Sequence, residues 1–262
     1  MVIAGVTVAA TNYAKSYMDA KDLFEVEHNV RVASEMIFRD LRTAGYGVHE
    51  TAHALDAWVD WIPGVTSSVV VVQGASISDP DQLVTVGSRV VPGGELQIDA
   101  TAGSTVLTLK SGGVLNFNTT TEKLLVLGRL ETARVVNITG NDLIISTDPS
   151  VNNVGLAFDH PANSPVELVT IVTYQCVSTN LSATGERPYL ARFQNTTAAT
   201  SSALLSIAAM GIEELQLTAE TNDTYRVVLT GRCTRNDPDY VHPAKGDHYR
   251  RYELDMTMQS WN

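Results

Sequence analysis

The sequence predicts an α+β fold, in which a long N-terminal α-helix packs on an antiparallel β-sheet head. Residues 1–47 have helical periodicity, whereas the chain after about residue 65 consists of short runs rich in Val, Ile, Leu and Thr, separated by turn residues. Because the helix comes first and the strands follow without alternating with further helices, this order favours α+β over α/β. We therefore divide the chain into an N-terminal helix, residues 1–47, and a β-rich globular head, residues 48–262.

An apolar stripe marks the second half of the predicted helix. Its members recur three or four positions apart, which places them on one face. Gly45 stands where a left-handed residue would end the helix. At about 1.5 Å per residue, such a helix spans roughly 65 Å and must project beyond the head. We expect the stripe to be buried partly under the chain's own sheet and partly against other helices. It consists of Leu23, Val26, Val30, Ala33, Ile37 and Leu41.

The first ten residues carry no charge. This apolar stretch is much shorter than the roughly 20 residues that a membrane span requires, and it resembles the second half of one. It has neither the basic leading segment nor the cleavage site of a secretory signal. The pattern favours a chain whose original amino terminus has been removed.

The head is predicted to contain many short strands and one short helix. Ser201 or Ser202 would begin that helix and Gly211 would end it. Turn-forming residues, including Pro92-Gly93-Gly94, separate the strands. The expected strands are 68–73, 83–90, 95–99, 105–109, 123–128, 132–138, 142–147, 166–177, 188–194, 212–219, 225–234 and 248–259.

Composition and charge narrow the function classes. The chain has 262 residues, of which 44% are hydrophobic and 18% are charged, so it can bury a sizeable core. Its formal charge of −11 opposes binding to phosphate backbones, which depends on Lys and Arg displacing counterions. Nucleic acid is therefore not expected as the main partner.

No motif for catalysis or cofactor binding is present in the sequence. The chain lacks a Gly-x-Ser-x-Gly elbow and a phosphate-binding loop, and no CxxC pair occurs. Its two cysteines, Cys176 and Cys233, lie far apart in β-like runs. They either form one disulfide in an oxidising compartment or remain two buried thiols, and the sequence leaves both alternatives open. We expect a non-enzymatic protein without a cofactor.

Two weaker patterns point to ligand binding. Asp237, Asp239 and Asp247 lie in a polar stretch that could offer oxygen ligands to calcium, although no fixed spacing supports such a site over a shaped hairpin loop. Trp58 and Trp61 follow the helix and could bind a sugar or a partner protein. Sealing the junction between helix and sheet is the favoured role for these aromatic residues.

Several segments resemble the PilW family of type IV pilus minor pilins, and the helix-end motif is the most specific of them. The family's leader with its processing site is missing, and the chain ends in Trp261-Asn262 where the family ends in Arg-Asn. The matching segments are Asn29-Val30-Arg31-Val32-Ala33, Arg39-Asp40-Leu41-Arg42-Thr43-Ala44-Gly45-Tyr46-Gly47, Pro188-Tyr189-Leu190-Ala191-Arg192, Gly211-Ile212-Glu213-Glu214-Leu215-Gln216-Leu217, Arg226-Val227-Val228-Leu229-Thr230-Gly231-Arg232 and Tyr249-Arg250-Arg251-Tyr252.

This resemblance implies a type IV pilin-like fold and a structural role. The subunit would sit in the bacterial inner membrane and periplasm before assembly and in the extracellular pilus afterwards. It would prime or cap the filament together with other minor pilins, the major pilin and a tip adhesin. Two alternatives remain: a minor pseudopilin of type II secretion, and a β-rich carbohydrate- or surface-binding module on a helical stalk.

Overall fold

The computed structural model describes residues 2–46, 68–74, 81–120, 123–148, 151–177, 188–194, 206–221 and 224–259. Within them, the chain is mostly β, with twelve strands in two antiparallel sheets and one α-helix. The predicted α+β class is therefore wrong, as is the expectation of a pilin-like fold with a long helix on a small sheet. The prediction gave the helix too much weight, because the order of elements does not reveal how far strands extend and pair.

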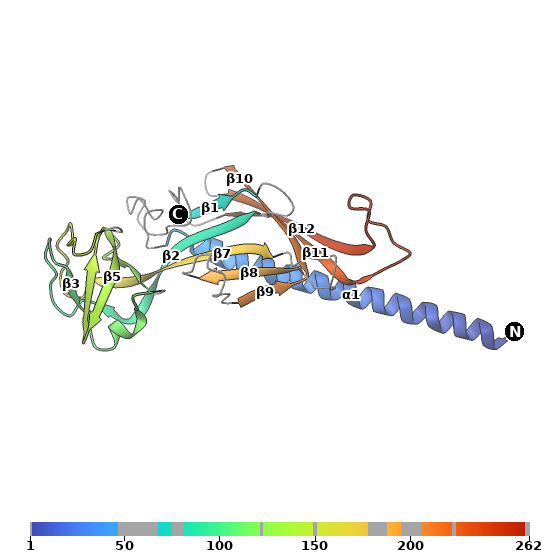
Figure 1. Ribbon diagram of the computed structural model, residues 1–262, viewed down its shortest axis with the longest axis horizontal. Helices are drawn as coiled ribbons and strands as arrows, with labels where there is room; N and C mark the ends of the chain where they lie inside the picture. The colour runs from blue at the N-terminus through green and yellow to red at the C-terminus, as the bar shows by residue number, and fades with distance from the viewer. Residues whose placement is uncertain are drawn as a thin grey trace.

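The helix, α1, runs from Val2 to Thr43 as 42 continuous residues. Its N-terminal part projects beyond the strands, and its C-terminal part lies along them (Figure 1). Gly45 ends the helix in the left-handed conformation, with φ 82°. Its N–H then donates to the carbonyl of Val86, 2.8 Å away, so the turn after the helix continues along the sheet edge.

The larger sheet is built around two long, paired strands, β2 (Gln82–Glu95) and β7 (Pro165–Val177). Strand β2 runs through Pro92-Gly93-Gly94, where a chain reversal was predicted. The register shifts between Val90 and Glu95 instead, so the segment forms an irregularity within one strand. The remaining strands of this sheet are β1 (Val69–Val72), β3 (Val106–Thr108), β4 (Leu124–Leu127), β5 (Glu131–Thr139), β6 (Asp142–Ser146), β8 (Tyr189–Gln194) and β9 (Ser206–Met210).

The larger sheet forks at β7. One edge of β7 pairs with β4 through residues 166–168 and with β8 through residues 172–177. The β4 branch continues into β5, β6 and β3, which with the short helix η1 (Gly113–Asn116) form what we call the distal lobe. This lobe lies at the opposite end of the molecule from the projecting helix (Figure 1). It has its own apolar core, which includes Leu107, Leu109 and Leu143.

The smaller sheet consists of β10 (Ile212–Thr221), β11 (Thr224–Asn236) and β12 (Tyr249–Gln259), in that order. Side chains join it to the larger sheet: Gln73 donates to the carbonyl of Leu217 at 2.8 Å, and Asp81 accepts from the N–H of Leu217 at 3.0 Å. The C-terminal half of α1 packs with residues of both sheets in one apolar core. The helix thus shares a single core with the head.

The predicted helix ending at Gly211 is wrong over its described part. Residues 206–210 form strand β9, which pairs with β8 through Leu190 and Ala209. Ala208 and Ala209 are buried, so pairing and burial outweigh the local helical pattern. Residues 201–205 lie outside the described part of the chain.

Candidate functional site

The predicted helix-packing stripe is buried against the chain's own head. Five of its six members are at most 5% exposed, and Leu23 is partly buried against the same core. This burial leaves little of the stripe for a partner helix. The five buried members are Val26, Val30, Ala33, Ile37 and Leu41.

A second apolar line begins on the projecting part of α1 and continues to Phe24, beside the start of the buried stripe. Val6, Tyr13, Tyr17 and Phe24 are 64%, 76%, 63% and 70% exposed. With about 100° of turn per residue, these four positions fall within about 40° of one another around the helix. Their line is centred about 140° from the buried stripe, so it faces away from the head. We call these four residues the outer line.

The sequence contains the outer line as steps of 7, 4 and 7 residues. This pattern is weaker than the stripe from Leu23 to Leu41 because its members are widely spaced and two of the four are tyrosines. Tyrosine also contributes little to hydropathy, although its ring provides a large apolar surface. The outer line is therefore recognisable in the sequence only if tyrosine is treated as an apolar residue.

The loop between β11 and β12, residues 237–248, contacts the projecting helix from the side opposite the outer line. Lys15 forms ion pairs with Asp239 and with Asp237, the latter with 3.8 Å between Nζ and Oδ1. Just before the loop, Arg235 lies 3.9 Å from Asp22. We call residues 237–248 the clamp loop, because these pairs hold it against the helix.

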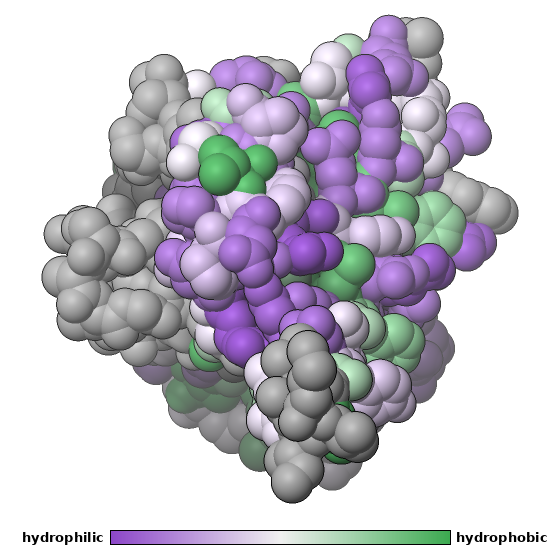
Figure 2. All heavy atoms as spheres, turned by 90° about the vertical axis from the view of Figure 1, so that its right-hand side faces the viewer, coloured by the Kyte–Doolittle hydropathy of each residue, from purple (hydrophilic) through white to green (hydrophobic). Residues whose placement is uncertain are grey.

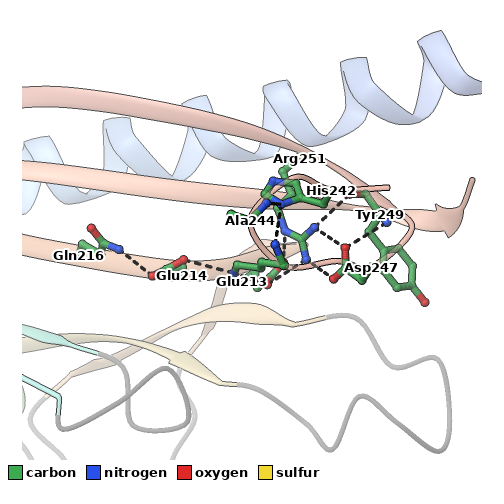
Figure 3. Close-up of polar contacts among 9 residues, drawn as sticks. Glu213, Glu214, Gln216, His242, Ala244, Asp247, Tyr249 and Arg251 are labelled. Carbon is green, nitrogen blue, oxygen red and sulfur yellow. Dashed lines mark hydrogen bonds and ion pairs between the residues drawn. The ribbon is translucent and has the colours of Figure 1, made fainter. Parts of the chain in front are cut away.

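Ion pairs also anchor the clamp loop to the smaller sheet (Figure 3). The Arg251 side chain is only 5% exposed, and its guanidinium lies 3.0 Å from Glu213 and 2.6 Å from Asp247. Lys245 adds a contact of 2.6 Å to Glu213. The hydrogen bond from Arg251 lowers the pKa of Asp247 to about 2. Burial alone would raise the pKa of Glu213. Hydrogen bonds from Arg251 and Lys245 have the larger combined effect, so the net pKa of Glu213 is lowered.

The three predicted calcium ligands are engaged by cations of the protein. Asp237 is paired with Arg250 at 2.8 Å, Asp239 with Lys15, and Asp247 with Arg251. Across the described ranges, no group of three or more His, Cys, Asp or Glu side chains is arranged to hold a metal ion. These carboxylates therefore act here as anchors of the clamp loop.

The two cysteines are free thiols, and both are buried. Burial, followed by the charges of Glu214 and Glu213, raises the pKa of Cys176. Burial and then Asp22 raise the pKa of Cys233 to about 11. Both cysteines belong to the apolar core that the helix shares with the two sheets, and no disulfide joins them.

The aromatic residues after the helix divide into two groups. Trp58 and Trp61 lie outside the described residues. Tyr46 is half exposed, and its hydroxyl accepts a hydrogen bond of 2.8 Å from Arg129, whose guanidinium lies 5.0 Å from the centre of the ring. Arg129 also lies 3.4 Å from the buried carboxylate of Glu167. Tyr46 thus fastens the turn after the helix to the distal lobe.

Seen along the helix from its N-terminal end, the surface is mainly hydrophilic, with isolated hydrophobic residues (Figure 2). In α1, no stretch of described residues is apolar enough to qualify as a membrane span. No protein-family model matches this sequence, and no curated protein is significantly similar to it.

Proposed function

We propose that this chain is a non-catalytic structural subunit of a bacterial filament, specifically a minor pilin that primes or caps a type IV pilus. Its partners would be other minor pilins, the major pilin and a tip adhesin. It would reside in the inner membrane and periplasm before assembly and in the extracellular pilus afterwards. The resemblance of residues 39–47 to the PilW helix ending supports this family, whereas the two-sheet fold differs from the pilin-like fold that the resemblance implies.

The outer line is the observation that carries the proposal. Its four large side chains are more than 60% exposed, and helix geometry places them on the side of α1 away from the buried stripe. Fully burying a side chain such as Phe24 contributes roughly 1.5 to 3 kcal/mol. A neighbouring helix in a filament would supply that burial along the whole line. The head would meanwhile remain folded, because its core uses the opposite side of α1.

Photocrosslinking tests this role in the bacterium that encodes the chain. A photoreactive phenylalanine replaces Tyr17 on the outer line, and a matched variant carries it at Asn12, which is also exposed but lies about 140° around the helix. We expect position 17 to crosslink to the helix of another pilin at least tenfold more than position 12. Filaments, counted by electron microscopy, should decrease when Tyr13 and Tyr17 are both replaced with Asp.

Three outcomes separate the proposal from its alternatives. Equal crosslinking at positions 17 and 12, with normal filament numbers in the double variant, would refute a packing role for the outer line. Crosslinks to pseudopilins of a secretion system would move the chain to the type II secretion alternative. Crosslinks to pilus subunits would support the minor pilin assignment.

A further inference from the structure

His242 shapes the clamp loop through an unusual acceptor. Its Nδ1 atom accepts hydrogen bonds from the backbone N–H groups of Ala244, at 3.3 Å, and Lys245, at 3.2 Å. Figure 3 shows the imidazole ring among these groups, next to Arg251. An Asp or Asn side chain often accepts such bonds in a turn. Only a ring with an unprotonated Nδ1 can do so, because imidazolium is a donor at both nitrogens.

The backbone bonds of the same turn place this ring at its centre. The N–H of Gly246 donates to the carbonyl of His242 at 2.8 Å, and the N–H of His242 donates to the carbonyl of Asp247 at 2.7 Å. The loop's second histidine behaves differently. Nδ1 of His248 lies 2.6 Å from the carbonyl of Tyr240, so this nitrogen is the donor. Protonation therefore preserves the contact of His248 but removes both side-chain contacts of His242.

The charged groups around His242 decide how the turn responds to acid. Asp247 is the facing carboxylate, and the hydrogen bond from Arg251 is the main cause of its lowered pKa. Arg251 and Lys245 both lie in this network, and the ring of Tyr240 is 6.4 Å from that of His242.

The carboxylate contact of this turn persists in mild acid. The lowered pKa of Asp247 means that its ion pair stabilises the fold fully above about pH 3.9, its unfolded value, and is lost as pH falls through about 2. Histidine is the side chain that changes charge between about pH 5 and 8. In that range, the Asp247–Arg251 pair stays intact.

We propose that His242 is a protonation switch in the clamp loop: the neutral ring caps the turn at residues 242–246, and the protonated ring releases it. The released turn weakens the position of the clamp loop, which carries Asp237 and Asp239, the partners of Lys15 on the projecting helix. Acid thereby loosens the contact between the head and the projecting half of α1. This inference does not depend on the identity of the helix's binding partner.

Hydrogen exchange across pH 5 to 8 tests the switch in the full chain, with each rate corrected for the intrinsic pH dependence of exchange. We expect the amides of residues 244–246 to lose protection by about three- to tenfold between pH 8 and pH 5. His242→Asn is the matched variant, because its side-chain oxygen accepts the same bonds without titrating. Its protection should stay constant over the same range.

Two results would overturn the proposal. One is an identical pH profile for the wild type and His242→Asn. The other is a ring tautomer with the proton on Nδ1 at pH 8, measured from the nitrogen chemical shifts of His242. Since His242→Asn retains the acceptor, the test does not require a variant that lacks the turn.

Discussion

Replacing Asp40 with alanine removes the acceptor that ties the C-terminal end of α1 to the larger sheet. Asp40 is 9% exposed. Its Oδ2 accepts hydrogen bonds from the Tyr174 hydroxyl at 2.7 Å and from Nε of Arg192 at 2.8 Å. Tyr174 is completely buried, and burial, together with Asp40, raises its pKa. The variant therefore leaves a buried hydroxyl and a largely buried guanidinium without their shared partner.

The size of the effect follows from these contacts. Breaking a buried ion pair by removing one partner costs about 3 to 5 kcal/mol. The Arg192 side chain is 15% exposed and keeps a contact of 3.4 Å to Gln194, so we expect the lower end, about 3 kcal/mol, for Asp40→Ala. Asp40→Asn keeps one oxygen acceptor but loses the charge, and about 1.5 kcal/mol is expected. Arg39→Ala should cost less than about 1 kcal/mol, because Arg39 is 67% exposed.

Urea unfolding followed by circular dichroism at 222 nm measures these differences, since the signal reports mainly on α1. Arg192→Met in the Asp40→Ala background should restore part of the lost stability, because it removes the uncompensated buried charge. A loss of less than 1 kcal/mol for Asp40→Ala would contradict the reasoning. So would an Arg39→Ala variant as unstable as Asp40→Ala.

Two further predictions concern the packing around the helix end and the thiols. Gly87→Ala should lower the thermal midpoint by several degrees in a calorimetric scan, because the added Cβ would lie 2.6 Å from the backbone oxygen of Thr43; an unchanged midpoint would show that the helix end can shift freely. Cys176 and Cys233 should resist a thiol reagent at pH 8 in the native protein, since burial raises both pKa values, and both should react in denaturant. Mass spectrometry showing a linked pair would contradict this.

Some local features were predictable from the sequence because neighbouring residues determine them. Gly45 takes the left-handed conformation that its position after the helix predicts. Other features at the helix end depend on distant residues: Asp40 accepts a hydrogen bond from Tyr174 of β7, whereas its neighbour Arg39 is exposed. Alternating patterns predict strands but do not encode their partners. The fork at β7, where Leu168 pairs with β4 and Cys176 with β8, was therefore not predictable.

The two opposite apolar faces of α1 determine how folding would be related to the proposed packing against a partner helix. The sequence suggested one stripe shared between the head and other helices, which would make each substitution in it affect both. The structure instead buries Val30 and Ile37 completely within the head and leaves Tyr13 and Tyr17 exposed on the opposite side. Substitutions in the buried stripe should therefore act mainly on stability, and those in the outer line mainly on association. A helix that presented only one apolar face could not separate these two effects, because any partner would compete with the chain's own sheet.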